Sequence, residues 1–447
     1  MSTKNYLLVL AVAALVSACG GGSSSEGTQG GNGSGSSIET ADKTKIKLDA
    51  IVQSQYCSYG AERPLSDVTV ILHNADGKIH SRYTTDANGH FEINWPAGVT
   101  HVTAHWKTKY NHHFLKTEIA PAHGDLGKIS FLDDDSSSCN CKTITIDSGD
   151  LRTAMPEYKV YRNYASGAVS GRMSAALQPL KLCADASNKF SVLQLMLAPN
   201  NTGPSYSREI DVGSLADQST IKLAIGDFKQ HGRALNLTSN LPISNSSAYT
   251  ASPTGRDFYF RATVGIDGPQ RLFERGSQSQ YAYAASSTTD ETPQGSLFYL
   301  SSRRLNVDPA ASTLDVQLPD NKTALTLRMQ QLMSDVLSRK ATSVDFSGYS
   351  RYQTLDMYVA GSNFSWSLHG GAKLTIPELE LPTAIQSDLN SGTTPSFQMQ
   401  LSALNPAWSL GTIQQKQAVS SRGQATPEQV AELSTWSTEL LDVTINP

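Results

Sequence analysis

Alternation of apolar and polar residues restricts the possible folds of this chain more than any other feature. From about Lys142 onward it recurs in short segments such as Leu193–Leu197, Leu355–Val359, Phe364–Leu368 and Phe397–Leu401, separated by Gly, Pro, Ser and Asn clusters. A period of two places every second side chain on one face of a β-strand. The pattern predicts a mainly β protein with a large antiparallel region over residues 150–447, as a sandwich or an open, curved sheet.

Two stretches of this region have helical spacing instead. Near the C-terminus, Thr426 as N-cap, Pro427 after it and Gln429 three residues beyond the cap form a capping box. This motif predicts a helix near residues 427–441. Its expected apolar side consists of Val430, Leu433, Trp436 and Leu440.

The second helical stretch is a stripe of Met, Leu and Val residues. It contains Met329, Leu332, Met333, Val336 and Leu337. Leu325 and Leu327, just before the stripe, alternate as in a strand. We interpret the stripe as a core face and not as a ligand groove, so the region is expected to hold one or two helices.

The first 18 residues have the layout of a signal peptide. Lys4 supplies a positive charge, Tyr6–Val16 is apolar, and small residues precede Cys19. A membrane-spanning helix needs about 20 apolar residues, so this stretch is too short to span a bilayer.

The sequence Val16-Ser17-Ala18-Cys19 resembles the lipobox of bacterial lipoproteins. The resemblance implies cleavage before Cys19 and lipid attachment to that cysteine, with acyl chains that hold the protein to a membrane. In the family's sorting pattern an Asp after the cysteine retains the protein at the inner membrane, whereas Gly20 follows here. The implied location is therefore the cell outer membrane, on either its periplasmic or its surface side.

Residues 19–38 carry the lipidated cysteine and a segment made mostly of Gly and Ser. Such a segment buries too little apolar surface to fold. We interpret it as a flexible linker between the lipid and the folded part.

Residues 42–132 combine short alternating strands with tight turns. Ile46, Leu48 and Ala50 alternate with polar residues, and the turn sequences Asn74–Gly77 and Asp86–Gly89 separate further strands. This spacing predicts a β-sandwich.

Two motifs of this range, Pro64–Val70 and Thr85–Phe91, resemble the carboxypeptidase regulatory-like domain. That family has a transthyretin-like β-sandwich fold. The resemblance implies a stabilising or binding module and brings no catalytic residues to this chain.

Residues 133–149 are interpreted as an acidic linker that contains cysteines. Asp133, Asp134 and Asp135 could offer oxygen ligands to calcium, but the run lacks the spaced ligands of an EF-hand loop. A solvated linker is the favoured interpretation.

Four cysteines remain besides Cys19, namely Cys57, Cys139, Cys141 and Cys183. In an oxidising envelope compartment an even number indicates disulfides. A bond between Cys139 and Cys141 would close a strained ring, so each is expected to pair outward with Cys57 or Cys183, and both pairings stay open. A zinc site of four thiolates is less favoured because the spacing does not match.

Eight of the ten histidines lie between His73 and His123. His112 and His113, adjacent in one loop, together with His123 are candidates for a transition-metal site. The favoured interpretation is a set of outward, solvated histidines on the sandwich, with a protonation switch as a third possibility. No metal or other cofactor is expected.

Motifs for catalysis are missing from the sequence. It has no nucleophile elbow, zinc-binding helix, phosphate loop or dinucleotide fingerprint. A sugar-stacking platform is conceivable but a core role is favoured for its aromatic members, Tyr281, Tyr283, Tyr349, Tyr352 and Trp366.

Charge and composition complete the functional expectation. A net charge of -4 gives no attraction to nucleic acid. No catalytic residue is assigned, and we expect a non-catalytic binding or structural adaptor, with an envelope protein or a glycan as possible partner. The alternative is an envelope hydrolase of glycan or peptide with its active site in residues 150–447.

Overall fold

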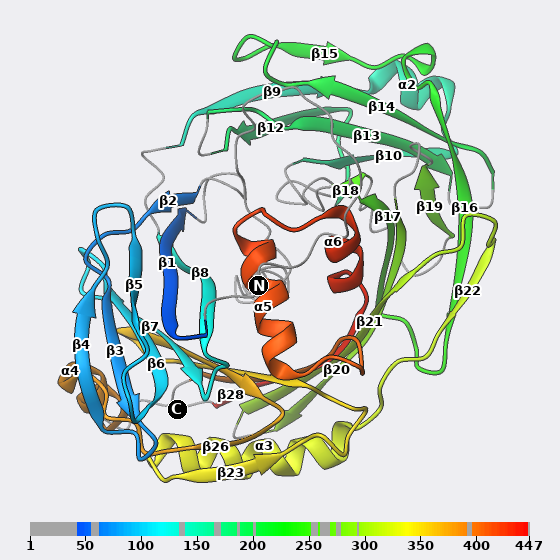
Figure 1. Cartoon of the computed structure of the whole chain (residues 1–447). Coiled ribbons are helices and arrows are strands. Elements are labelled where there is room, and N and C mark those ends of the chain that lie inside the picture. Colours follow the sequence, from blue (N-terminus) through cyan, green and yellow to red (C-terminus); the bar gives the residue numbers. More distant parts are fainter. Residues whose placement is uncertain are drawn as a thin grey trace, which may run out of the picture.

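The computed structural model describes residues 43–445 of the chain, apart from 55–61, 134–138, 165–170, 186–187, 200–202, 252–257, 260–268, 274–278, 293–294 and 391–395. The protein is mainly β, with several antiparallel sheets and few helices (Figure 1). This confirms the fold class that the alternating pattern predicts.

The N-terminal strands form two sheets that face each other. One contains β1 (Lys45–Ser54), β2 (Glu62–Pro64), β5 (His90–Asn94) and β8 (Gly124–Asp133). The facing strands are β3 (Thr69–Asn74), β4 (Ile79–Thr84), β6 (Val99–Lys107) and β7 (His113–Ile119). Buried side chains such as Leu48, Val70 and Phe131 fill one core between the two layers. The expected Asn74–Gly77 hairpin turn joins β3 to β4.

A twelve-stranded sheet, counted over the described residues, runs in the order β18-β17-β20-β21-β28-β27-β24-β25-β7-β6-β3-β4. Its C-terminal members are β17 (Asn245–Ala251), β18 (Phe258–Tyr259), β20 (Gln280–Thr292), β21 (Gly295–Asn306), β24 (Thr354–Ala360), β25 (Phe364–Gly371), β27 (Ser396–Ala403) and β28 (Trp436–Ile445). β7 and β25 pair in parallel. The N-terminal sandwich and the C-terminal strands therefore share one continuous sheet.

The C-terminal strands bury one face of this sheet. Over that face lie α3 (Lys322–Leu337), α4 (Thr383–Asn390) and the pair β23 (Thr342–Asp345) and β26 (Lys373–Ile376). Their common core includes Met329 and Leu332 of α3 together with Met357 and Leu368 of the sheet. The Met and Leu stripe is thus a core face, as the sequence favoured.

The strand-like interpretation of Leu325 and Leu327 is wrong, because α3 already begins at Lys322. Leu325 is fully buried whereas Leu327 is 66% exposed. On a helix these positions point to different sides, although in sequence they imitate the alternation of a strand.

A second β unit with its own core follows the sandwich. One sheet contains β9 (Cys141–Asp147), β12 (Leu177–Cys183) and β15 (Thr220–Lys222). The other contains β10 (Tyr158–Asn163), β11 (Gly171–Arg172), β13 (Val192–Pro199), β14 (Ser205–Asp211), β16 (Gln230–Ser239), β19 (Gln270–Phe273) and β22 (Thr313–Val316). Residues 133–149 are therefore not a linker throughout, since Ile144 and Ile146 of β9 alternate into this core.

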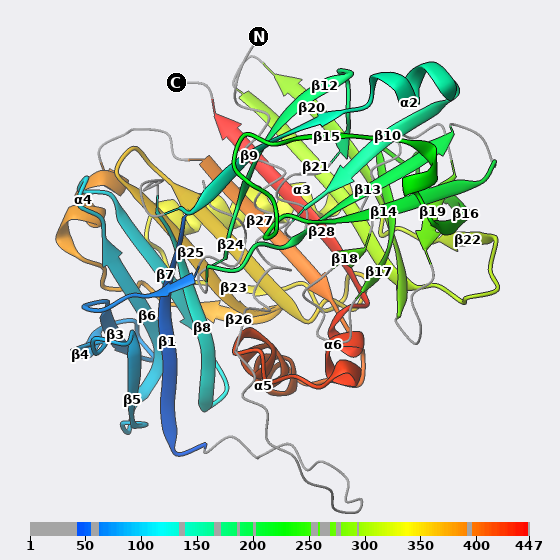
Figure 2. The ribbon, with the colours of Figure 1, turned by 90° about the horizontal axis from the view of Figure 1, so that it is seen from above.

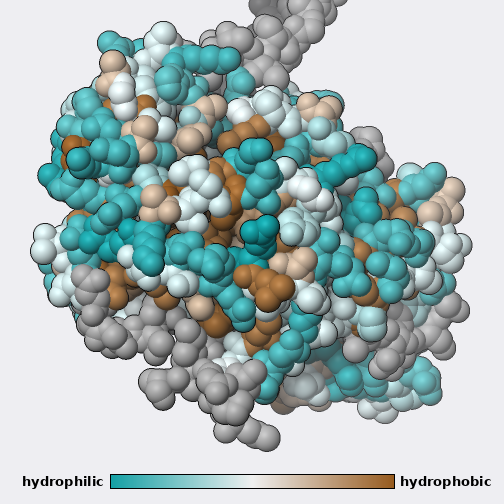
Figure 3. Space-filling view, turned by 90° about the horizontal axis from the view of Figure 1, so that it is seen from below, coloured by the Kyte–Doolittle hydropathy of each residue, from teal (hydrophilic) through white to brown (hydrophobic). Residues whose placement is uncertain are grey.

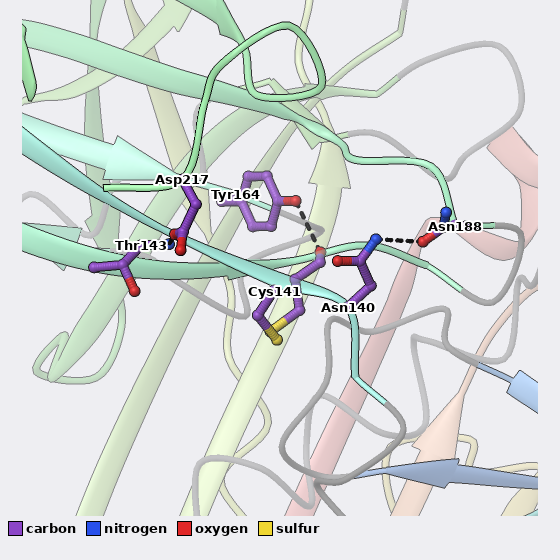
Figure 4. The surroundings of a disulfide bond; sticks show 7 residues. Asn140, Cys141, Thr143, Tyr164, Asn188 and Asp217 are labelled. Carbon is purple, nitrogen blue, oxygen red and sulfur yellow. Dashed lines mark hydrogen bonds between the residues drawn. A yellow bond between two sulfur atoms is a disulfide. The ribbon is translucent and has the colours of Figure 1, made fainter. Parts of the chain in front are cut away.

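Cys141 and Cys183 face each other across β9 and β12 and form a disulfide with an S–S distance of 2.04 Å (Figure 4). Beside it, the Tyr164 hydroxyl donates to the carbonyl of Cys183 at 2.8 Å. This bond is one of the outward pairings expected from the sequence. Cys139 is disulfide-bonded as well, and Cys57 lies outside the described residues.

The predicted C-terminal helix is present but shorter than expected. In α6 (Pro427–Leu433) the hydroxyl of Thr426 accepts from the Gln429 amide at 3.3 Å, and Oε1 of Gln429 accepts from the Thr426 amide at 2.9 Å. This confirms the capping box. Trp436 and Leu440 belong instead to β28, which pairs with β21 and β27 on its two sides. Tertiary pairing overrides the helical spacing there.

Further helices lie outside the two stretches that the sequence favoured. They are α2 (Gly149–Ala154), α4 and α5 (Leu410–Ser421). Within the described part of the chain, no helix combines the length and the apolar character needed to cross a membrane.

Helix α5 packs against β8. The Ser421 hydroxyl accepts from the Lys128 amide at 3.0 Å, and Oε1 of Gln414 accepts from the Ala122 amide at 2.8 Å. Gly127 has φ +75°, and a Cβ there would lie 2.8 Å from the Cα of Ala418. The sheets curve round α5 and α6, which lie toward one end of the strands (Figures 1 and 2).

Candidate functional site

Polar side chains form a continuous band across five neighbouring strands of the twelve-stranded sheet. In one row, successive cross-strand neighbours are Glu118, His369, Asp356 and Gln400. In the adjoining row they are Lys116, Ser367, Tyr358, Gln398 and Asp442. Directly opposite side chains lie about 5 Å apart in such pairs. We call these two rows together the polar ladder.

The alternation of the strands explains why these side chains gather. In β24, β25 and β27 every second residue is apolar and enters the core beneath α3, so the residues between them point to the opposite face. That face lies inside the curve of the sheets, on the side of α5 (Figure 1). A Cβ on Gly371, which shares the face of His369, would lie 3.2 Å from Leu410 at the start of α5.

His369 and Asp356 form the tightest contact of the ladder. Nδ1 of His369 lies 2.6 Å from Oδ1 of Asp356, and the two side chains are 23% and 22% exposed. Burial by itself lowers the pKa of His369, but the charges of Asp356 and Glu118 and the hydrogen bond to Asp356 outweigh it and raise the pKa to about 10. The imidazole is therefore protonated at neutral pH. Its Nε2 has no hydrogen-bond partner among the described residues.

Lys116 and Glu118 carry charges that their neighbours offset only through space, since each is near the other and near His369 or Asp356. Within the part of the chain that the structure describes, neither side chain has a hydrogen-bond or ion-pair partner. Burial lowers the pKa of Lys116 and raises the pKa of Glu118. Removing a charge from water without pairing it costs several kcal/mol. The ladder therefore keeps two charged groups in an environment that opposes their charge.

At the far end of the second row the polar groups satisfy each other. Nε2 of Gln398 donates to Oδ2 of Asp442 at 3.1 Å. Asp442 is buried, and burial raises its pKa. The unsatisfied groups thus concentrate at the β7 and β25 end of the ladder.

The histidines proposed as metal ligands are not brought together. His112 Nε2 lies 3.1 Å from the Ser365 hydroxyl, His113 Nδ1 lies 2.9 Å from Nε2 of His105, and the ring of His123 stacks on Trp95. No group of three potential metal ligands occurs among the described residues.

The expectation of outward, solvated histidines is wrong for part of the cluster. His73 is fully buried and His101 is 3% exposed. His73 lies 3.1 Å from the Gly77 carbonyl and 3.0 Å from the Thr103 hydroxyl, and burial lowers its pKa to about 4. The reason is long-range packing, because the Glu380 amide donates to that same Gly77 carbonyl and brings its segment over this face.

Other residues named from the sequence take structural positions or lie outside the description. Four aromatic residues of the sugar platform are buried, namely Tyr281, Tyr283, Tyr352 and Trp366. Tyr349 is partly exposed and packs against the core that contains Tyr352 and Trp366. This agrees with the favoured core role. Cys19, Asp134 and Asp135 lie outside the described residues.

A hollow of about 490 Å³ lies on the opposite side of the sheet, between α3 and the β23–β26 pair. Leu332, Val344 and Phe346 contribute apolar surface to its lining. Seen from that side, hydrophobic surface gathers near the middle of the face among hydrophilic side chains (Figure 3). Lys373 in its lining already pairs with Asp345 at 3.0 Å. Arg328, also in its lining, is exposed to solvent, so the charges of this hollow are less desolvated than Lys116 and Glu118 of the ladder.

Sequence reasoning missed the polar ladder entirely. The alternating segments indicate core positions, but their spacing does not show which polar residues from different strands lie side by side. One signal was present, because Lys116 and Glu118 alternate with Leu115, Thr117 and Ile119 and so place two charges on one face of a strand. Only the pairing of β7 with β25 places them beside His369 and Ser367.

No protein family matches the sequence, and no curated protein matches it either. Among solved structures, the Bacillus anthracis TIE protein is similar at 11% identity and a TM-score of 0.15, over 61% of this chain and 50% of that chain. The chain thus spans half the length of that protein. A TM-score this low supports no conclusion about fold or function.

Proposed function

We propose that this chain is a lipid-anchored protein of the bacterial cell envelope that binds a polar ligand without transforming it. The leader and the lipobox ending in Cys19 support the anchor, and Gly20 supports an outer-membrane location. The membrane is a partner through the lipid alone. The module resembling the carboxypeptidase regulatory-like domain agrees with a binding role.

One observation carries the binding proposal, namely that Lys116 and Glu118 are desolvated charged groups on one face of the sheet and form no hydrogen bond or ion pair with the described residues. Perturbed, unsatisfied groups concentrate at functional sites, because a ligand can supply the missing partners. Gln398 and Gln400 add amide donors and acceptors along the same face. The ladder thus suits a molecule rich in polar groups, such as a small solute, a glycan unit or a segment of an envelope protein.

The protonation of His369 argues for binding over nucleophilic catalysis. A histidine that acts as a general base must be deprotonated, and it works best with a pKa near the operating pH. His369 has a pKa of about 10 and is held by Asp356, so it suits the role of a fixed hydrogen-bond donor.

A hydrolase remains the second candidate because two carboxylates share the first row of the ladder. Glu118 and Asp356 stand two strands apart, so their backbones are separated by about 10 Å. Inverting glycosidases place their carboxyl groups about 6.5 to 9.5 Å apart. His369 lies between the two carboxylates and engages Asp356, which leaves that carboxylate poorly placed to activate water.

Binding and turnover can be tested on the mature, full-length protein in detergent micelles. We expect ligand-dependent thermal stabilisation with members of a glycan, peptide and small-solute library, and no product formation. The Glu118→Gln variant should lose the stabilisation, whereas Lys373→Met, on the other side of the sheet, should keep it. Reproducible turnover abolished by Glu118→Gln would replace the binding proposal with the hydrolase.

The anchor needs a separate test. Mass spectrometry of the mature N-terminus should find acyl chains on Cys19, and Cys19→Ala should leave the membrane fraction. An unmodified N-terminus in the membrane-associated protein would contradict the proposed anchor.

A further inference from the structure

The charges left unpaired on the polar ladder have both signs, and they lie next to one another. Lys116 and Glu118 are two residues apart on β7, so their Cα atoms are about 7 Å apart on the same face. His369 stands directly opposite Glu118, and Ser367 directly opposite Lys116. A ligand on this part of the sheet meets a positive and a negative group at once.

Asp356 needs no partner from a ligand, because it already pairs with His369. Nδ1 of His369 donates to Asp356, and the Nε2 proton of the same ring is left without a partner in the described part of the chain. Lys116 and Nε2 of His369 can therefore both donate hydrogen bonds to an anion. The carboxylate of Glu118 can accept hydrogen bonds from a cation.

We infer that the polar ladder binds a zwitterion, a small molecule that carries both a carboxylate and an ammonium group. The carboxylate would bind between Lys116 and Nε2 of His369, and the ammonium would bind Glu118. A free amino acid and the ends of a short peptide both offer this chemistry. The inference names the ligand class of the site and so rests on the function proposed above.

Other ligand classes leave part of the site unsatisfied. A neutral sugar gives neither Lys116 nor Glu118 a counter-charge, and an unpaired charge in an enclosed site keeps its desolvation cost. An anion such as phosphate would pair with Lys116 but would face the carboxylate of Glu118. A metal ion would face Lys116 and the protonated His369, and the described residues hold no group of three potential metal ligands.

Isothermal calorimetry on the mature, full-length protein tests this inference with five probes. They are L-alanine, the dipeptide alanyl-alanine, N-acetylalanine, alanine amide and glucose. We expect binding of L-alanine or of the dipeptide, whichever has the fitting separation of charges. N-acetylalanine and alanine amide each lack one charge and should bind at least about tenfold more weakly, because each leaves one half-buried charge of the site without a counter-charge.

Two variants link binding to the named side chains. Lys116→Met and Glu118→Gln should each weaken binding of the preferred zwitterion at least about tenfold. Without ligand, both variants should have about the stability of the parent, because each removes a charge that burial opposes together with its attraction to a neighbouring opposite charge. This second readout separates a lost contact from a damaged fold. Lys373→Met serves as the matched control and should bind like the parent.

The outcomes distinguish this inference from the function it rests on. Binding of glucose through the ladder, with no binding of the zwitterions, would overturn the inference and leave the binding function standing. If the two ladder variants bound the zwitterion like the parent, the assigned site would be wrong. Absence of heat with all five probes would overturn the inference, and absence of binding in the wider library would overturn the function too.

Discussion

The guanidinium of Arg422 donates two hydrogen bonds to one carboxylate, that of Asp125, from Nε to Oδ2 at 2.9 Å and from Nη2 to Oδ1 at 2.7 Å. Arg422 follows α5, and Asp125 belongs to β8. The same guanidinium forms an ion pair with Asp49 of β1, and its side chain is only 9% exposed. One arginine near the C-terminus therefore joins α5 to both parallel strands of the N-terminal sandwich.

Arg422→Ala should loosen α5 from the sandwich. Removing the cation leaves Asp125 and Asp49 without their partner, and breaking a buried ion pair in this way costs about 3 kcal/mol. Hydrogen–deuterium exchange should speed up across residues 410–421, and the free energy of unfolding in urea should fall by that amount. Gln417→Ala on the exposed side of α5 is the control and should change stability by less than about 0.5 kcal/mol. Unchanged exchange in Arg422→Ala would mean that the close packing at Gly127 suffices to hold the helix.

Asp356→Asn should remove a pH-dependent part of the stability. The pKa of His369 is raised from an ordinary 6.5 to about 10 in the folded protein. A group whose pKa is raised by folding stabilises the folded state fully at pH values below its unfolded pKa, here 6.5. This contribution is lost as the pH rises toward the folded pKa of about 10. The variant should therefore lose about 2 kcal/mol at pH values below the unfolded pKa and much less above the folded one.

Urea unfolding at both pH extremes, with an NMR titration of His369, measures this effect. In the parent, the imidazole should stay protonated through neutral pH, and in Asp356→Asn its pKa should fall. Asp290→Asn is the control, because Asp290 is 53% exposed where it pairs with Lys322 and should contribute less than about 1 kcal/mol. A parent His369 that titrates near its ordinary value would contradict the pairing seen here.

Local chemistry made part of the fold predictable. The strands around Leu48, Leu195 and Met357 follow from period two, and the start of α6 follows from the reciprocal bonds of Thr426 and Gln429, because such features depend on a few neighbouring residues. The end of α6 did not follow, since pairing partners far along the chain draw the residues after Leu433 into β28.

The candidate site could not be predicted from the spacing of neighbouring residues in the sequence. Lys116 and His369 share one face only because β7 pairs in parallel with β25, and no local spacing encodes that register. Helix α5 was missed for a related reason, since its sequence lacks an apolar stripe and its burial comes from packing on β8. The histidines His73 and His101 look solvated in sequence for the same reason, because distant residues cover them.

Glu439→Gln should destabilise the start of α3. The buried carboxylate of Glu439 accepts from the hydroxyls of Tyr299 and Tyr352, and from the backbone and side-chain nitrogens of Asn321 at 2.9 Å and 2.7 Å. A glutamine would point a donor at these donors and cost about 2 kcal/mol. Exchange should rise first in the N-terminal turn of α3, because Asn321 is its N-cap. Glu432→Gln, at a half-exposed site, is the control, and equal effects of the two changes would contradict the role given to the Glu439 network.

Replacing both members of the Cys141–Cys183 disulfide with alanine should lower stability without changing the fold. The bond spans 42 residues. Loop-closure entropy for that length corresponds to about 4 kcal/mol of the free energy of unfolding. Peptide mapping without reductant should recover Cys141 linked to Cys183 in the parent. It should also recover Cys139 linked to Cys57, which is the pairing that the sequence leaves once Cys183 is taken. A peptide that links Cys139 to any other cysteine would contradict this assignment. An unchanged free energy of unfolding in the double variant would show that packing alone holds the two strands together and that the disulfide adds no stability.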